Sequence, residues 1–470
     1  MPVQLPLEKG RPSATATLFA VLAAAVRRFP AVFGALPPDD LAGHQSPRLA
    51  TRMLMRFEVL RAQSLASADI ARFVTDWIQA SFIDDSQPAG GSLEQMMAGR
   101  DSPSSSYEVS TTGPGVVAEE PNYGVEELSK RLRELDERQY LSKEALLALQ
   151  WAGGRAAGAE LPVDLRGQRF VLLGGTAELA PLALLLNAGA DVLTTNTSPD
   201  SLWRAASVDT VTSRPGSKGR LFAIEGGVDL LVAPAAFVGS ALEFARERPV
   251  HVAALAYRGG QAREWRLTAA MDGVIRSLSR AGAVSSVTYY LSPSVPTEVS
   301  PDTAGVSLRR LAKDRSWRTE ITRSISRNAL YQPNILEAGG RFWSRSFVAR
   351  QGVSYQAGNL FGKNYAAESW HAAGLRVSAN VAPITRTRST EIPRAKVAFS
   401  EIERLGVRAF EPWLTRRLMF LMMMHDLFGS DPGPAGVPFP QQVHGGVFTN
   451  PWSLNSVLQL AYLKARAKGH

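Results

Sequence analysis

The chain has 470 residues, of which 45% are hydrophobic and 20% are charged, and its formal net charge is +9. This length and composition allow a well-buried core in one large domain with attached segments. Because cysteine is absent, disulfides, thiolate catalysis and cysteine-based zinc or iron–sulfur sites are excluded. The six histidines are scattered without ligand spacing, so we predict no metal site.

The positive charge is dispersed along the sequence, mostly as arginine, instead of being packed into one basic arm. It could attract an anionic surface, but we predict no nucleic-acid binding. No apolar run approaches the roughly 20 residues of a transmembrane helix, and the N-terminal run at 14–26 is followed directly by two arginines. Glu8 and two early prolines disfavour a secretory signal, so we expect a cytoplasmic protein without a transmembrane segment.

The first third of the chain reads as helical, with one weakly ordered stretch. Residues 1–83 form the predicted N-terminal region, in which apolar residues at 50–82 recur at the spacing of an amphipathic helix or helix pair. We expect this face to pack against the rest of the chain or a second subunit, and we predict a homo-oligomer. Residues 84–123 are rich in Ser, Gly and Pro and predict a linker or flexible loop, and 124–168 predict a helical lead-in.

The pattern changes at residue 169. A short apolar strand, two glycines and a compact apolar helix at 179–188 are the opening of a βαβ unit, and helices at 267–281 and 355–373 alternate with later strands. The predicted strands are 169–173, 191–195, 221–224, 229–233, 250–257, 284–291 and 375–381. Residues 169–390 therefore predict an α/β fold, a Rossmann-type doubly wound and mostly parallel sheet, with helical N-terminal and C-terminal additions.

Two further segments belong to this organisation. Residues 301–351 are an arginine-rich insertion with Trp317 and Trp343, for which we predict a lid over the substrate site or an oligomer contact. The C-terminal region, 391–470, is again helical, and its methionine-rich helix at 413–428 is expected to fill core or to line an adaptable pocket.

The turn after the first strand, residues 174–180, is where a dinucleotide-binding fold places its phosphate loop. It resembles the loop of the short-chain dehydrogenase/reductase superfamily, which usually reads Thr-Gly-x3-Gly-x-Gly. Gly174 matches the first glycine, but the later two fall on Glu178 and Ala180, and a glutamate there must point away from a pyrophosphate or repel it. The cofactor residues that the resemblance implies at this turn are Gly174, Gly175, Thr176, Glu178 and Leu179.

The resemblance also implies which nicotinamide cofactor is bound. Asn196 and Thr197 stand where an acidic residue would accept the ribose hydroxyls of NAD, so NADP is favoured over NAD, with Arg204 as a partner for a 2′-phosphate. Further contacts are expected at Pro383 and Thr385, and at either Ala233 or the segment 256–258. A scaffold that has lost the nucleotide is the alternative.

In this superfamily a serine after the fifth strand acts with a Tyr-x3-Lys on the following helix. The tyrosine transfers the substrate proton, and the lysine lowers its pKa. The matching helix has Tyr355, with Asn359 at the lysine position and Lys363 one turn later; residues four apart advance by only about 40° around a helix, so all three line one stripe. Ser292 and Ser294 are the serine candidates.

Enoyl reductases of the superfamily usually have Tyr-x6-Lys and a second tyrosine near the fifth strand, for which Tyr290 is the candidate. The resemblance thus implies an NAD(P)H-dependent reductase acting on a ketone or enoyl group of a hydrophobic small-molecule or carrier-bound substrate. The alternative is a non-redox Rossmann-scaffold protein, either a lyase, cyclase or isomerase or a regulatory or assembly partner. In that case Tyr355 and Lys363 are ordinary helix-surface residues.

Overall fold

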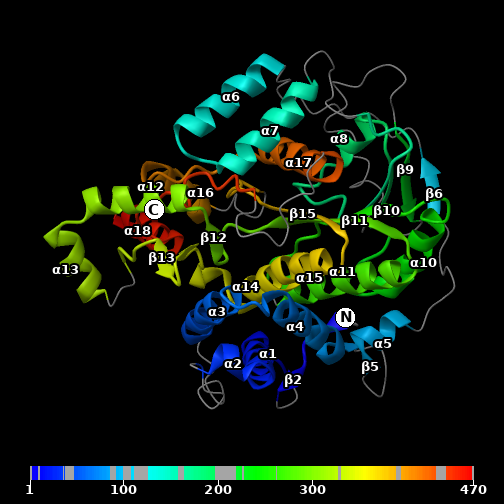
Figure 1. The fold of residues 1–470 in the computed structure, drawn as a ribbon, viewed down its shortest axis with the longest axis horizontal. Coiled ribbons are helices and arrows are strands. Elements are labelled where there is room, and N and C mark those ends of the chain that lie inside the picture. Colours follow the sequence, from blue (N-terminus) through cyan, green and yellow to red (C-terminus); the bar gives the residue numbers. More distant parts are fainter. Residues whose placement is uncertain are drawn as a thin grey trace.

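The structure is a computed structural model of the whole chain. It describes residues 3–8, 11–34, 36, 47–84, 91–98, 107–110, 125–156, 164–195, 219–224, 227–260, 262–326, 330–387, 393–429 and 441–467. Figure 1 shows a central sheet between two helical layers, with a further helical layer beyond one of them and a separate group of elements beside the carboxyl ends of the strands.

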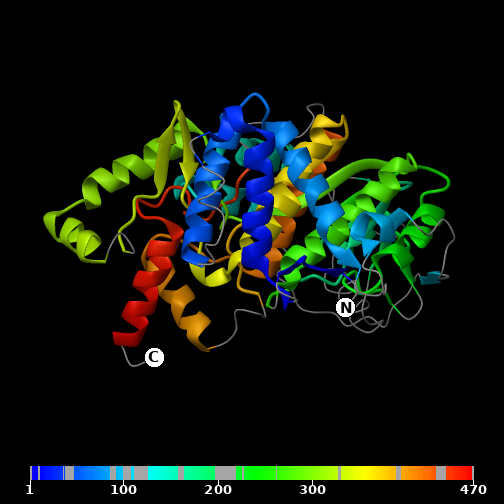
Figure 2. The same ribbon diagram turned by 90° about the horizontal axis from the view of Figure 1, so that it is seen from below.

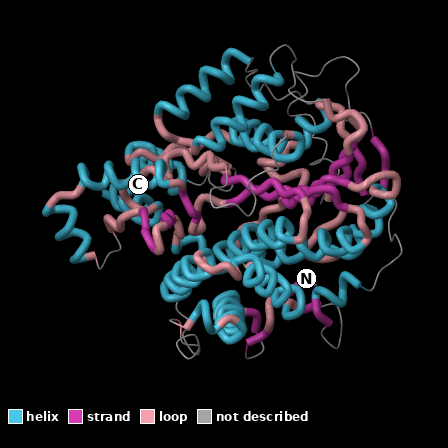
Figure 3. The backbone as a smooth tube through the Cα atoms, viewed as in Figure 1, coloured by secondary structure: helices cyan, strands magenta, loops and turns pink. Residues whose placement is uncertain are grey.

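The central sheet has seven strands in the order β15-β11-β10-β7-β8-β9-β6 (Figures 1 and 3). All neighbouring pairs are parallel except β6 with β9. The bounds are β7 Arg169–Leu173, β8 Asp191–Thr194, β9 Leu221–Ile224, β10 Val250–Ala254, β11 Val284–Leu291, β15 Arg376–Val381 and β6 Tyr107–Ser110. The chain runs from β7 outward to β9, then returns to β10 and runs outward to β15. This is the doubly wound Rossmann order, so the predicted fold class is confirmed.

Alternate residues of the strands enter two different cores, as the period of two in a strand requires. Val171, Leu173 and Tyr289 belong to the core under helix α11, while Phe170 and Tyr290 belong to the core under helix α17. Residues 170–173 are all buried, because helices cover both faces of a parallel sheet. The two faces are called the α11 face and the α17 face below.

The α11 face is covered by helices that connect the later strands, and the N-terminal helices pack outside them (Figures 1 and 2). The covering helices are α10 Pro234–Phe244, α11 Arg263–Arg280, α14 Val353–Asn359, the π-helix η4 Leu360–Tyr365 and α15 Ala366–Ala372. The outer layer contains α1 Ala14–Arg28, α2 Pro30–Phe33, α3 Pro47–Ala62, α4 Ser67–Ser81 and α5 Leu93–Ala98. The predicted helix pair at 50–82 is thus α3 and α4, and it packs within the chain, with α4 against α15 and η4.

Polar contacts fix the outer layer in place. The guanidinium of Arg61 donates to Glu58 at 2.8 Å and to Glu368 of α15 at 2.7 Å, and it lies 4.2 Å from the centre of the Tyr365 ring. The Tyr365 hydroxyl donates to Glu58 at 2.5 Å. A buried charge is stable only when it is paired and hydrogen-bonded, so this network fixes one arrangement of α3 against α15.

The α17 face is covered by α6 Val125–Glu137, α7 Lys143–Ala156, α8 Leu182–Asn187 and α17 Pro412–Phe428. Within the helical lead-in predicted at 124–168 the structure describes two helices, α6 and α7, which separate around Gln139, a residue with a φ of 57°. The methionines of α17 lie in the core between α7 and the sheet, and those at 419 and 422–424 have no exposed surface. They fill core, and so the alternative of a pocket lining is wrong for them.

The insertion and the C-terminal segment pack together near the carboxyl ends of the strands. The insertion contains α12 Pro301–Asp314, α13 Trp317–Ile325, β13 Ile335–Ala338 and β14 Arg341–Ser344, and β14 also pairs with β12 Thr297–Val299. α16 Pro393–Arg404 and α18 Leu454–Ala467 complete this group. The amide of Asn334 donates to the carbonyls of residues 447, 448 and 450, which ties the insertion to the C-terminal segment.

Two sequence expectations differ from the structure. Residues 229–233 are not a strand, because the Asp229 carboxylate accepts from the Leu231 amide and its carbonyl accepts from Val232 and Ala233, which makes a turn into α10. The predicted linker 84–123 contains β5 Gly91–Ser92, α5 and β6. Among the described residues no helix has both the length and the apolar character needed to cross a membrane.

Candidate functional site

The site begins at the point where the chain reverses direction in the sheet, between β7 and β10. In doubly wound folds ligands bind outside the carboxyl ends of the strands at this point. Here the first residue after β7 lies directly against the backbone that follows β10. Gly174 has a φ of 101°, and a Cβ at that position would lie 2.5 Å from the Cα of Ala256. Only glycine fits this approach, which also places the segment 256–258 beside the turn.

The glycine turn uses its first amide groups within the protein. The N–H of Gly174 donates to Thr195 Oγ1 at 2.8 Å, and the N–H of Gly175 donates to Thr194 Oγ1 at 2.9 Å. A Cβ on Gly175 would lie 2.2 Å from that same Thr194 oxygen. Both glycines are therefore required by the packing of the turn against the end of β8, and the two threonines were not among the predicted site residues.

The helix that should follow the turn is shorter than predicted. α8 begins at Leu182 instead of residue 179, and Pro181 at its N-cap has no N–H to offer. Thr176, Glu178 and Leu179 consequently lie in tight turns before the helix. The carbonyl of Glu178 accepts two hydrogen bonds from the Arg416 guanidinium of α17, at 3.0 and 3.2 Å. The positive charge of Arg416 thus lies beside the turn, next to the residue whose side chain is the Glu178 carboxylate.

A dinucleotide at this site would need a changed phosphate contact. Gly174 and Ala256 mark the required place in the fold, and Arg416 supplies a positive charge beside the turn. The first two amides are already satisfied, so the N–H of Thr176 and the Arg416 guanidinium are the groups here that would hold a pyrophosphate. The nicotinamide end of the dinucleotide would lie toward the three hydroxyl groups that are described next.

Three hydroxyl groups meet after the end of β11. Ser292 Oγ lies 2.9 Å from the Tyr355 hydroxyl and 2.8 Å from Ser294 Oγ. The two serines are buried in the turn after the strand, and the partly buried tyrosine comes from α14. We call Ser292, Ser294 and Tyr355 the hydroxyl cluster. Each hydroxyl can both donate and accept, so the cluster can move a proton to or from the Tyr355 oxygen.

Burial raises the pKa of Tyr355 above its ordinary value of 10.0, and the negative charge of Glu264 and the neighbouring Tyr257 raise it further, whereas the Ser292 hydrogen bond lowers it. The Tyr257 ring lies 6.1 Å from the Tyr355 ring, edge to face. Burial and Glu264 also raise the pKa of Tyr257. Both phenols therefore stay protonated at physiological pH. The pKa of Tyr355 is raised by burial and not lowered by a lysine, contrary to what the resemblance implied, because Lys363 is paired with Glu264.

Lys363 is paired with an acid. Its Nζ lies 3.3 Å from Glu264 Oε1 in a nearly dry site, and Glu264 Oε2 accepts from the Arg258 amide at 3.0 Å. Lys363 belongs to the π-helix η4, which lies against α11, so the register of the stripe predicted for a regular helix is broken between Asn359 and Lys363. The lysine charge is matched by Glu264, which the sequence prediction did not include.

The remaining predicted residues of the reaction site lie apart from the hydroxyl cluster. Asn359 is buried, and its amide donates to the Tyr355 carbonyl at 2.9 Å, one turn earlier in the helix. Tyr290 lies in the core of the α17 face, whereas Tyr355 comes from a helix on the α11 face. The second tyrosine expected for an enoyl reductase therefore does not face Tyr355. Because neighbouring residues of a strand point to opposite faces, this orientation follows from the strand register.

The other predicted cofactor residues are dispersed. Pro383 follows β15 and is buried, and Thr385 Oγ1 lies 2.9 Å from Thr415 Oγ1 of α17. Of the two alternatives for the next contact, Ala233 lies between β9 and α10. The segment 256–258 follows β10 and therefore lies at the switch point. Asn196, Thr197 and Arg204 lie outside the described residues.

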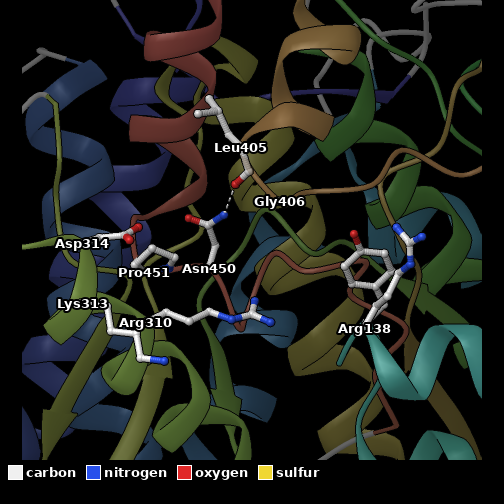
Figure 4. Close-up of a pocket in the computed structure, with 9 residues that line it drawn as sticks. Arg138, Arg310, Lys313, Asp314, Leu405, Gly406, Asn450 and Pro451 are labelled. Carbon is white, nitrogen blue, oxygen red and sulfur yellow. Dashed lines mark hydrogen bonds between the residues drawn. The ribbon is translucent and has the colours of Figure 1, made fainter.

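Two cavities lie elsewhere, beside the end of α6, and both include Arg138 and Tyr140. The first, of about 450 Å³, is formed with α12 and the C-terminal segment, and charged side chains such as Arg310 and Lys313 line it (Figure 4). The second, of about 530 Å³, is lined largely by arginines and glutamates. The second is lined mainly by polar surface, and neither includes a residue of the glycine turn or of the three hydroxyl groups described above. In the described ranges, no group of three or more acidic, histidine or cysteine side chains could hold a metal ion.

No protein-family model matches the chain, and no curated protein matches it. Solved structures of short-chain dehydrogenase/reductases and ketoreductases are similar to it at low identity. They include the angucycline C-6 ketoreductase LanV with bound NADP, at 15% identity and a TM-score of 0.37, over 61% of this chain and 97% of that one.

A putative short-chain alcohol dehydrogenase from Sinorhizobium meliloti 1021 has 15% identity and a TM-score of 0.35, over 61% of this chain and 98% of that one. An A1-type ketoreductase has 14% identity and a TM-score of 0.33, over 58% of this chain, which spans only 53% of that protein. At such low similarity the Rossmann-type assignment rests on the strand order and connections described above.

Proposed function

We propose that this protein is an oxidoreductase of the short-chain dehydrogenase/reductase type, which reduces a ketone of a hydrophobic substrate. The observation that carries the proposal is the 2.9 Å contact between Ser292 and Tyr355 at the carboxyl edge of the sheet, next to the switch point. A serine and a tyrosine hydroxyl in contact can bind a carbonyl oxygen together and protonate it. Burial and Glu264 keep Tyr355 protonated, which is the form that a proton donor needs, while the raised pKa makes it a weaker acid than a tyrosine assisted by a lysine.

A nicotinamide dinucleotide would supply the hydride that the substrate carbon accepts. In this proposal Tyr355 gives its proton to the carbonyl oxygen, Ser292 hydrogen-bonds to that oxygen, and Ser294 holds Ser292 in place at 2.8 Å. The proton lost by Tyr355 would be replaced from solvent after the product leaves, since Tyr355 is only partly buried. Asn359 fixes the turn of α14 that carries the tyrosine. A ketone is favoured over an enoyl group because Tyr290 lies on the other face of the sheet.

The test measures cofactor binding and turnover separately. We expect NADPH or NADH fluorescence to change on titration, and ketones supplied free or as thioesters to be reduced by the wild type. Tyr355→Phe should bind the nucleotide unchanged and lose turnover. Binding of neither nucleotide together with no reduction of any ketone would contradict the proposal.

A second candidate function, a Rossmann scaffold without redox chemistry, is favoured by the glycine turn. There the amides of Gly174 and Gly175 bond to Thr195 and Thr194 and are not available to a phosphate. This candidate predicts no nucleotide response and no effect of Tyr355→Phe beyond stability. The same titration therefore separates the two functions.

A further inference from the structure

The helices α12 and α13 of the insertion form an arm at the edge of the molecule. Figures 1 and 2 show it extending away from the central sheet, with α13 at its tip. No residue of α13 is buried, so this helix contributes nothing to the core. Residues 301–325 are called the arm below.

The tip carries an apolar stripe that faces solvent. Trp317, Ile321 and Ile325 are spaced by four residues and therefore advance by about 40° per step, so they share one side of α13. Their exposed fractions are 69%, 49% and 80%. The other tryptophan of the insertion, Trp343, is buried. An exposed cluster of large apolar side chains on one helix face is typical of a surface that binds something.

Basic residues outnumber acidic residues along the arm. The arm has six basic residues against three acidic ones. Of these acids, Glu320 pairs with Arg315 at 2.5 Å and with Arg323 at 3.1 Å, and Asp302 pairs with Lys143 at 2.5 Å. Arg318 lies 5.3 Å from the centre of the Trp317 ring, so a cation accompanies the aromatic side chain.

We propose that the arm binds peripherally to an anionic lipid surface. Trp317, Ile321 and Ile325 enter the headgroup region, and Arg318 and the other basic residues of the arm attract lipid phosphates. A lipid surface is favoured over a protein partner because the stripe stands in an arm with an excess of basic over acidic residues, which an anionic headgroup layer neutralises. A lipid surface needs no complementary shape. Lipid binding is independent of the reductase chemistry proposed above.

The experiment uses the full chain with vesicles of phosphatidylcholine, with and without phosphatidylserine. We expect co-sedimentation only with the phosphatidylserine vesicles, a blue shift of tryptophan emission on binding, and release by salt. The triple variant Trp317→Ser, Ile321→Ser, Ile325→Ser should lower partitioning by roughly tenfold or more. The matched control Leu65→Ser, Leu147→Ser, Leu463→Ser removes three exposed apolar side chains outside the arm and should bind as the wild type does.

A second pair of variants tests the charge. Lys313→Gln, Arg315→Gln, Arg318→Gln should lower partitioning by roughly fivefold per charge, whereas Arg27→Gln, Arg52→Gln, Arg133→Gln removes the same charge from other elements and should have little effect. Equal losses in both variants, or no binding to either vesicle, would overturn the proposal. So would a concentration-dependent dimer that the serine variant abolishes, because the stripe would then bind a second copy of the chain.

Discussion

The hydroxyl cluster after β11 and the glycine turn after β7 lie at the same edge of the sheet, but their polar groups are used differently. In the cluster, the Tyr355 hydroxyl is bonded to Ser292, a group that can pass a proton on. In the turn, the amides of Gly174 and Gly175 donate to Thr195 and Thr194, and these bonds hold the turn against the end of β8. The difference shows that one edge of a sheet can combine hydroxyl groups placed for proton transfer with a glycine turn whose usual phosphate-binding amides are already bonded.

The largest expected effect separates these two regions directly. Tyr355→Phe removes the proton donor and leaves the aromatic packing against Tyr257. We expect kcat for ketone reduction to fall by about 10³-fold, within the range for loss of a general acid, while nucleotide affinity stays the same. Steady-state kinetics and fluorescence titration measure the two quantities. A variant with full activity would show that the hydroxyl cluster has no catalytic role.

The ion pair of Lys363 with Glu264 lies near Tyr355, but the two charges are paired with each other. It therefore tests whether Lys363 stabilises the fold or takes part in the reaction. Lys363→Met leaves a buried carboxylate without its partner, and we expect the free energy of unfolding to fall by about 3 kcal/mol. Glu264→Gln should cost a similar amount, and the double variant should cost less than the sum. Urea unfolding tests this cycle. If Lys363→Met instead lowers kcat without a change in stability, the lysine acts in the reaction.

The pH dependence of the reaction follows from the same neighbours. Because burial and Glu264 raise the pKa of Tyr355, its proton is retained well into the alkaline range. The rate of reduction should therefore stay constant from neutral pH to about pH 10, and the reverse oxidation, which needs the phenolate, should be slow. Glu264→Gln removes the negative charge and should move the alkaline decline to lower pH. A decline near neutral pH in the wild type would contradict this assignment.

The sequence predicted the hydroxyl cluster better than it predicted the surroundings of the cluster. The resemblance to the superfamily singled out Ser292, after the fifth strand, and Tyr355, on the following helix, and the structure brings the two hydroxyls into contact. The partner of Lys363 could not be predicted, because Glu264 is 99 residues away and the contact depends on a π-helix that the apolar pattern does not reveal. Periodicity shows that Tyr289 and Tyr290 point to opposite faces, but only the packing of the helices shows which faces they are.

The fold, too, was predicted where local apolar spacing records it and missed where other contacts determine it. Alternating strands and helices predicted the doubly wound sheet, since each element is recorded in local apolar spacing. The edge strand β6 was missed because it forms by antiparallel pairing with β9, which is distant in the sequence. The turn at 229–233 was missed because it depends on the hydrogen bond from the Leu231 amide to the Asp229 carboxylate. For the same reason the bonds from Thr194 and Thr195 to the glycine turn were not predicted.

The smallest expected effect concerns the glycine turn itself. Glu178 places a carboxylate where the superfamily has glycine, but Arg416 bonds to the backbone carbonyl of this residue, a contact that survives any change of side chain. Glu178→Gly should therefore leave the cation in place, remove the negative charge and strengthen dinucleotide binding by a factor of about 3 to 5, as expected for a charge screened by solvent.

Glu178→Gln is the matched control, since it removes the charge and keeps the side chain. If both variants bind NADPH and NADH more tightly, repulsion by the carboxylate limits affinity in the wild type. If the glycine variant alone does so, the side chain obstructs the site by its size. Unchanged affinity in both, with measurable binding in the wild type, would place the phosphates away from this turn and leave the hydroxyl cluster as the better guide to where the substrate binds.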